Sequence, residues 1–340
     1  MHRLHRLAAP AAALLLLTLL SHTACGATLL RDDFNGTSLN QAVWRLPTGD
    51  GTFFGRTQIR PPSQAPVVSN GVVTLLLDTH NPTAGTPGDS FWGHEIQTRT
   101  LFSVGDGLSI KSRLRFVDGA PLGRVGGFFT YGIEPPFQVR DEIDFELLSN
   151  DAGDQTIFTN VFDDDDFSVG GDSRNVFVSG LDITQFTEYE IRWLPDRIQW
   201  FVDGQLIRVE TGTVTDDPQE VRINHWAPDV FFSNAFDASL QPVASPALNE
   251  SFALEVDYVE VTQISPGDYD IDGDVDVADI LKWQRGESFI PLSPGDKAVW
   301  EANFGSPNNL AATAVPEPAS AALAGLLVAC LWGHRRHGKP

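Results

Sequence analysis

Cysteine and basic residues are scarce in this chain, and each scarcity excludes a class of protein. The 340 residues contain 2 cysteines, Cys25 and Cys330, which lie near the two ends. The body between them therefore has no disulfide, and its stability must come from a packed core and from metal. Lysine and arginine number 23 against 45 acidic residues, for a formal net charge of −22. Because nucleic-acid binding requires a basic surface, this balance argues against a nucleic-acid partner.

Apolar runs lie at the two ends of the chain, and neither is typical of a membrane-spanning helix. Residues 1–27 indicate a secretory signal peptide, because Arg3 and Arg6 precede an apolar core at 11–20. The run at 321–332 is shorter than the ~20 residues that span a bilayer comfortably. We therefore expect an exported protein that is secreted or held at the cell surface.

The tail at 307–340 has three parts, which are a Val315-Pro316-Glu317-Pro318 motif, the apolar run, and the basic cluster 334–337. This order resembles the PEP-CTERM sorting tail of some bacteria. The resemblance implies processing at a bacterial cell surface, and contact with the membrane only through this tail.

The body at 28–264 is divided into short runs of alternating apolar and polar residues, with no long helical periodicity. Clear strands are expected at 71–77, 108–116 and 252–261. A hairpin is expected at 189–202 with its turn at 195–197, and a second tight turn at Asp203-Gly204. Many short strands predict an all-β fold, a jelly-roll sandwich of two sheets.

The most informative stretch reads Asp-Glu-Ile-Asp-Phe-Glu-Leu-Leu at 141–148. Glu142, Asp144 and Glu146 alternate with apolar residues, so all three acids lie on one face of a strand. Crowded carboxylates separate one another's pKa values, and cleavage of a glycosidic bond needs one protonated and one ionised carboxyl. The alternatives are a solvated acidic face and a calcium site, although calcium usually takes its oxygens from a curled loop.

Several further motifs resemble glycoside hydrolase family 16 over most of 30–262. They are the opening 31–36 followed by Trp44, the strand 127–131, the hairpin ending at 200–204, and the closing 256–259. The resemblance implies a β-jelly roll of the concanavalin type, whose concave sheet binds polysaccharide, and a retaining mechanism. It assigns Glu142 as nucleophile, Glu146 as general acid/base, and Asp144 as the acid that hydrogen-bonds the nucleophile.

The same resemblance implies the sugar-binding residues, which are Trp226, Asn224, Glu95, Phe129, Tyr131 and Asn160. For each of them the alternative is packing within the sheet. Aromatic faces stack on a pyranose and amides bond its hydroxyls. Arg140 stands where lichenases usually have tryptophan, which leaves open a carboxylated or sulfated sugar bound by its guanidinium. The family also implies a structural calcium ion with Asp257 as its side-chain ligand.

Residues 268–279 match the spacing of an EF-hand-type calcium loop. Its expected ligands are Asp268, Asp270, Asp272, Asp276 and Asp279, and a helix is expected at 280–286. The small helical module at 265–306 resembles a dockerin, which implies a cohesin-like partner. Its second half has lost the acidic loop, so one calcium ion is expected.

These observations predict an exported endo-acting hydrolase of 1,3-1,4- or 1,3-β-glucan, because the acids at i, i+2 and i+4 resemble lichenases and xyloglucan-active enzymes. Many laminarinases, agarases and carrageenases insert one more residue there as a bulge. The alternatives are a transglycosylase, a galactan hydrolase for agarose or carrageenan, and a non-catalytic lectin-like domain. A lectin has no need of the acid triplet.

Overall fold

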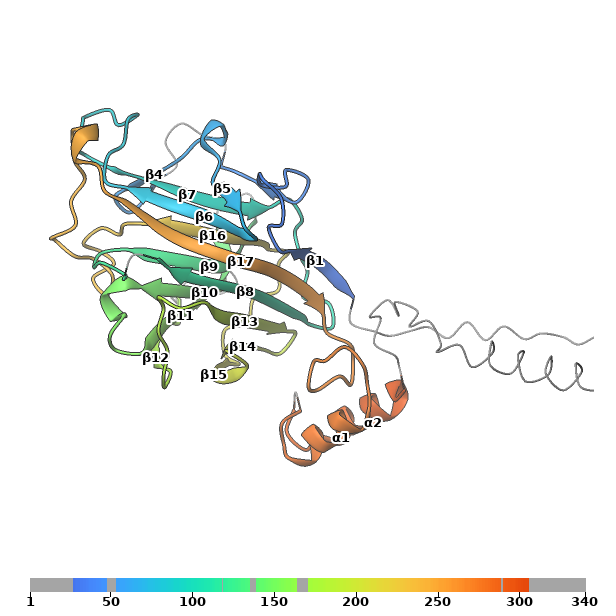
Figure 1. Ribbon diagram of the computed structural model, residues 1–340. Helices are drawn as coiled ribbons and strands as arrows, with labels where there is room; N and C mark the ends of the chain where they lie inside the picture. Colours follow the sequence, from blue (N-terminus) through green and yellow to red (C-terminus); the bar gives the residue numbers. More distant parts are fainter. Residues whose placement is uncertain are drawn as a thin grey trace, which may run out of the picture.

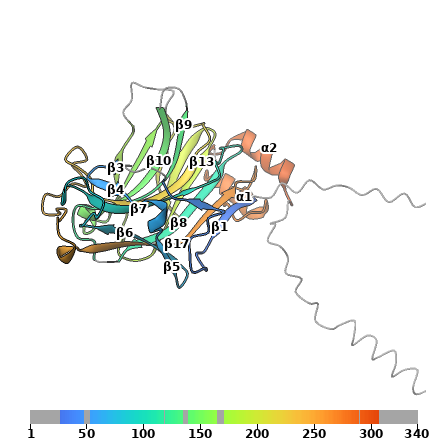
Figure 2. The same cartoon turned by 90° about the horizontal axis from the view of Figure 1, so that it is seen from above.

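A computed structural model describes residues 27–47, 53–117, 119–134, 139–163, 171–288 and 290–305. This part of the chain forms two mainly antiparallel sheets packed face to face, with two α-helices at one end (Figures 1 and 2). Both cysteines, the tail predicted at 307–340 and all but the last residue of the signal peptide predicted at 1–27 lie outside the described residues.

The first sheet is built around the long strand β17. Its order is β5 (Val67–Ser69), β6 (Val72–Asp78), β17 (Ser251–Gln263), β8 (Leu108–Phe116), β13 (Thr187–Leu194), β14 (Arg197–Val202) and β15 (Gln205–Glu210). The first strand of the chain, β1 (Thr28–Asp32), also pairs with β17.

The second sheet contains the acidic strand at its centre. Its order is β12 (Arg174–Phe177), β11 (Thr156–Phe162), β10 (Val139–Leu148), β9 (Val125–Glu134), β16 (Glu220–Trp226), β7 (Phe91–Thr98) and β2 (Trp44–Arg45). A short hairpin of β3 (Phe53–Phe54) and β4 (Thr57–Ile59) joins β7, where β4 pairs in parallel. Three 3₁₀ turns lie at Pro62–Gln64, Ser149–Asp151 and Pro246–Leu248.

The predicted two-sheet all-β architecture is confirmed, and the strand predictions hold to within a few residues. The expected strand at 108–116 is β8, and Asp203 and Gly204 both have positive φ, as the tight turn between β14 and β15 requires. The turn predicted at 195–197 is shorter in the structure, because Arg197 pairs with Leu194 as the first residue of β14.

The core lies between the sheets and holds one face of β10 in place. Ile143, Phe145 and Leu147 point into it and are fully buried. Trp200 of β14 reaches across from the first sheet, and its indole N–H donates to the backbone oxygen of Asp144 at 3.0 Å. Apolar burial is worth about 25 cal/mol per Å², so this packing determines which residues of β10 face outward.

Two helices follow the sandwich, α1 (Val277–Gln284) and α2 (Pro294–Asn303), and both lie near the ends of β17 and β1 (Figures 1 and 2). The helix predicted at 280–286 begins earlier, because Asp276 caps it and forms a capping box with Asp279. It ends before Gly286, which has a φ of +73°. Neither helix in the described part of the chain is long and apolar enough to cross a membrane.

Candidate active site

The three acids of β10 lie together on the face of the second sheet that points away from the core. Strand register places a matching residue of β9 beside each: Tyr131 beside Glu142, Phe129 beside Asp144 and Gly127 beside Glu146. The register of β10 with β9 and β11 runs through these positions without a bulge.

A depression of about 290 Å³ lies over this face. Seven of the predicted site residues line it together, and they come from three neighbouring strands: Glu142, Asp144, Glu146, Phe129, Tyr131, Asn224 and Trp226. The remaining lining residues, which the sequence did not single out, are Phe54, Gly127, Ile133 and Arg222.

Gly127 keeps the floor of the depression low. A Cβ at this position would stand 2.5 Å from Oδ1 of Asn224, closer than real contacts allow. Asn224 is the neighbour of Gly127 on β16, and Glu146 is its neighbour on β10. The absent side chain therefore leaves room between the acid and the amide.

The electrostatics of the three acids assign them different protonation states. Burial, and then the charge of Glu142, raise the pKa of Glu146 to about 8, so this carboxyl is protonated at neutral pH. Burial and the charges of Glu142 and Glu146 also raise the pKa of Asp144 well above its usual value. Asp144 hydrogen-bonds Glu142, which favours a protonated Asp144 donating to an ionised Glu142.

Arg140 lies on the same side of β10 as Glu142 and forms an ion pair with its carboxylate. Its guanidinium also stacks on the ring of Phe162, 3.9 Å from the centroid. Burial raises the pKa of Glu142, and Arg140 is the strongest influence in the opposite direction. Arg140 was predicted to bind sugar, but it is not among the residues that line the depression.

Glu95 supports the depression from β7 and lies beneath it. Its carboxylate accepts hydrogen bonds from Asn224 at 3.1 Å and from Gln97 at 2.5 Å, and Arg222 lies 3.6 Å away. The residue is buried, and burial raises the pKa of its carboxyl. Glu95 thus orients Asn224. It also lines a second hollow of about 890 Å³, which shares Phe54 and Arg222 with the depression.

Aromatic side chains form one wall of the depression. Trp226 stacks on Phe232 with ring centroids 6.1 Å apart, and the ring centroid of Phe54 lies 6.2 Å from that of Trp226. Phe129 and Tyr131 meet edge to face at 6.5 Å. Arg222 shares parity with Asn224 and Trp226 on β16, so alternation could have identified it. Phe54 comes from a distant hairpin, and nothing in the sequence signals its position.

Asn160 lies on β11 beside Asp144, but it is not among the residues that line the depression. It is buried, and its side-chain oxygen accepts from the backbone N–H of Val161 at 3.0 Å. Asp257 lies on the other sheet, where it forms an ion pair with Arg113 at 2.7 Å. Sugar binding by Asn160 and calcium binding by Asp257 therefore stay predictions.

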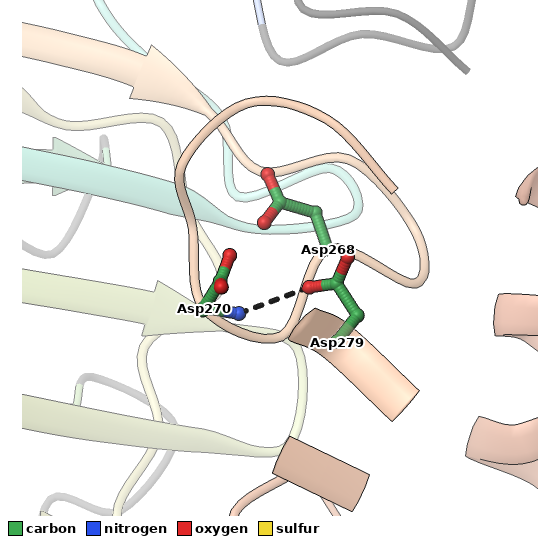
Figure 3. A group of neighbouring side chains, drawn as sticks. All are labelled: Asp268, Asp270 and Asp279. Atoms are coloured by element: carbon green, nitrogen blue, oxygen red, sulfur yellow. Dashed lines mark hydrogen bonds between the residues drawn. The ribbon is translucent and has the colours of Figure 1, made fainter. Parts of the chain in front are cut away.

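A separate group of acids lies at the start of the helical module. Carboxylate oxygens of Asp268, Asp270 and Asp279 lie within 4.8 Å of one another (Figure 3). Asp279 also belongs to a second such group with Asp274 and Asp276. Asp274 was not predicted as a ligand. Asp272 was predicted, but it lies outside both groups and accepts from the backbone N–H of Asp274.

The chemistry of this acidic loop suits a hard cation. Within the described residues, Oδ1 of Asp270 and Oδ1 of Asp274 are buried atoms that have no hydrogen-bond partner. Burial, followed by the charge of Asp279, raises the pKa of Asp268 to about 7 and that of Asp270 to about 6. A divalent cation with oxygen ligands would satisfy these groups.

Comparison with known proteins gives one family. The model of the family described as glycosyl hydrolases family 16 matches residues 62–247, which is more than half of the chain. Endo-1,3-1,4-beta-glycanase ExoK of Rhizobium meliloti is 30% identical over 169 residues, covering 49% of this chain and 56% of that protein. Probable xyloglucan endotransglucosylase/hydrolase protein 23 of Arabidopsis thaliana is 34% identical over 145 residues, covering 42% of this chain and 43% of that protein.

The chain therefore spans about half the length of the curated relatives it matches. Among solved structures, a β-1,3-1,4-glucanase (lichenase) derived from a mouse hindgut metagenome superposes with a TM-score of 0.54 at 20% identity. This match covers 69% of the present chain and 99% of the lichenase. The likeness confirms the jelly-roll fold that the sequence predicted.

Proposed function

The chain belongs to family 16 of the glycosyl hydrolases, and from this membership we propose that it is an exported, retaining, endo-acting hydrolase of β-linked glucan. The observation that carries the proposal is the acid triplet in the depression, where Glu146 has a pKa of about 8 beside an Asp144–Glu142 hydrogen bond. That arrangement supplies one proton donor and one carboxylate on the same strand.

In the proposed mechanism, the Glu142 carboxylate attacks the anomeric carbon while Glu146 donates its proton to the departing glycosidic oxygen. The C–O bond to the leaving sugar breaks as the bond to Glu142 forms. Glu146, now ionised, then takes a proton from water, whose oxygen displaces Glu142 from the same carbon. Two inversions retain the configuration, so ¹H NMR of the first product should show the β-anomer before mutarotation. An initial α-product would contradict the retaining mechanism.

The substrate proposed is a neutral mixed-linkage β-glucan. Strand β10 keeps the regular spacing of its acids without a bulge, and the curated relatives include an endo-1,3-1,4-beta-glycanase. The net charge of −22 also disfavours polyanions by long-range repulsion.

We expect reducing-sugar release from lichenan to exceed that from laminarin, xyloglucan, agarose and κ-carrageenan, with little change on adding salt. A sulfated galactan as the best substrate would overturn the assignment to neutral glucan. Binding without release from any polymer of the panel would favour a lectin-like domain.

Transglycosylation is the second candidate activity, because one curated relative is named an endotransglucosylase/hydrolase. The two activities differ only in whether water or a sugar hydroxyl attacks the glycosyl-enzyme. Incubation of the glucan with a fluorescent oligosaccharide acceptor separates them, since only transfer places the label on long chains.

We also propose that the loop at 268–279 binds one calcium ion. Asp268, Asp270 and Asp279 would hold it, with Asp272 and Asp276 as the further ligands that the loop spacing implies. The resemblance to a dockerin rests on this loop and on α1 and α2. We likewise propose a cohesin-like partner, the calcium ion implied at Asp257, and membrane contact through the tail at 307–340.

Isothermal titration of the calcium-free chain should then show that Asp279→Asn binds one calcium ion fewer than the wild type, while the ion implied at Asp257 is unaffected. A pH test follows from the raised pKa values of Asp268 and Asp270. Without calcium, the folded loop binds protons more readily than the unfolded chain between about pH 4 and pH 7, so its stability should fall as pH rises through that range. Hydrogen exchange of peptides from 268–303 measures this, and stability that rises with pH in chelator would contradict the prediction.

Export is tested by the mass of the mature protein from its native host. Removal of a segment that ends near residue 27 would support the signal peptide, and an intact N-terminus in the cytoplasm would exclude it.

A further inference from the structure

The ion pair between Arg140 and Glu142 is unusual, because it engages the carboxylate that the proposed mechanism uses as its nucleophile. The two residues are separated by one position on β10, so their side chains leave the strand on the same face. The Arg140 side chain is 43% exposed, whereas that of Glu142 is 16% exposed. The guanidinium therefore approaches the nucleophile from the solvent side.

The position of this guanidinium is fixed by a ring beneath it. Phe162 is the neighbour of Glu142 on β11, and the guanidinium lies 3.9 Å from the centre of its ring. Gly171 packs closely against the same ring, since a Cβ at 171 would stand 2.5 Å from Cε1 of Phe162. A hydrogen bond of 2.9 Å from Asp172 N–H to the Val161 carbonyl holds the two segments together. Stacking of arginine on a ring limits its rotamers, so Arg140 is held in place.

The other groups around Glu142 explain why a cation is needed there. Asp144 and Glu146 on β10 are acids, Tyr131 on β9 is a neutral phenol, and β11 contributes the uncharged Asn160 and Phe162 to this face.

On β16, the charged residues near this group are Glu220 and Arg222. Arg222 lies 2.6 Å from Glu220 and 3.6 Å from Glu95, and it stacks on Tyr131 at 4.0 Å. The charge of Arg222 is thus shared between two acids, whereas the partners of Arg140 in the described structure are Glu142 and the Phe162 ring.

We propose that Arg140 is a positioning residue that keeps the Glu142 carboxylate ionised and aimed into the depression, and that it does not bind sugar. The inference rests on the proposed role of Glu142 as nucleophile. Burial favours a protonated, inactive Glu142. The contact with Arg140 is the strongest influence that opposes burial, followed by the hydrogen bond from Asp144 and the charge of Arg222.

The test compares Arg140→Gln, which removes the charge, with Arg140→Lys, which retains it. Removing a neighbouring cation raises a carboxyl pKa, so Arg140→Gln should shift the acidic limb of the kcat/KM profile to higher pH. At a pH on the acidic limb, kcat/KM should fall about tenfold. KM for a neutral glucan should remain nearly unchanged. Arg140→Lys should keep the limb close to its original position.

Arg113→Gln is a matched control. Arg113 is 42% exposed, pairs with Asp257, and lies 5.0 Å from the ring of Phe186, but it belongs to the opposite sheet. This variant should leave the profile unchanged, which separates the local field at Glu142 from a general change in charge.

A direct titration makes the test independent of turnover. ¹³C-carboxyl NMR of the free enzyme, with the Glu142 resonance assigned from Glu142→Gln, should show a higher titration midpoint in Arg140→Gln. An unchanged midpoint would overturn the proposal. So would an Arg140→Gln enzyme that raises KM for an anionic polymer with its pH profile intact, because that result assigns Arg140 to the substrate. If the wild-type chain cleaves no glucan, the proposed function fails, while the NMR titration still decides the role of the ion pair.

Discussion

Replacing Glu142 by Gln is expected to lower kcat/KM for glucan about ten-thousandfold, or roughly 5.5 kcal/mol of barrier, with the fold intact. The amide has nearly the same shape, but it cannot form the glycosyl-enzyme. Because the side chain of Glu142 faces outward while Ile143 and Phe145 hold the strand in the core, thermal unfolding should change little.

The shorter variant Glu142→Ala provides the sharper form of this test. It leaves space for a small anion, so azide should attack the anomeric carbon directly and restore part of the rate on an activated glycoside. A single displacement gives an α-glycosyl azide, the opposite configuration from the hydrolysis product. Near wild-type activity in Glu142→Gln would exclude Glu142 as the nucleophile, and a β-azide product from Glu142→Ala would assign the nucleophile to another residue.

Replacing Glu146 by Gln should cost about a hundredfold to ten-thousandfold in kcat/KM on glucan, the range that general acid catalysis contributes. The loss should depend on the leaving group. An aryl glycoside that departs without protonation should still form the glycosyl-enzyme, so its first step should be much less affected than glucan cleavage.

The pH profile checks the same residue. With a pKa of about 8, Glu146 is protonated and active as an acid below that pH, so wild-type kcat/KM should fall as pH rises through about 8. In Glu146→Gln this basic limb should disappear. The acidic limb, which reports the coupled Glu142 and Asp144 carboxyls, should remain. A basic limb that persists in the variant would assign the proton donor to another group.

The sequence alone determined the elements of this molecule that follow from local periodicity. A strand has a side-chain period of two, so the alternation at 141–148 was sufficient to place three acids on one face and three apolar residues in the core. The same rule located β8 and the hairpin of β13 and β14, and the Asp203-Gly204 pair located the next turn. The acidic loop at 268–279 could be predicted as a calcium site because its proposed ligands lie close together in the chain, although the early start of α1 and the place of Asp274 were not foreseen.

Only the tertiary structure decided which segments meet at the depression. Phe54 comes from a separate hairpin, and Glu95 lies beneath the depression with a hydrogen bond to Asn224, since strand order is set by pairing between distant segments. Arg140 shows the difference most clearly. Its sequence position suggested a sugar ligand, but the fold brings Phe162 under its guanidinium and Glu142 against it. Contacts of this kind depend on register between strands and on burial, and neither is encoded in the spacing of one segment.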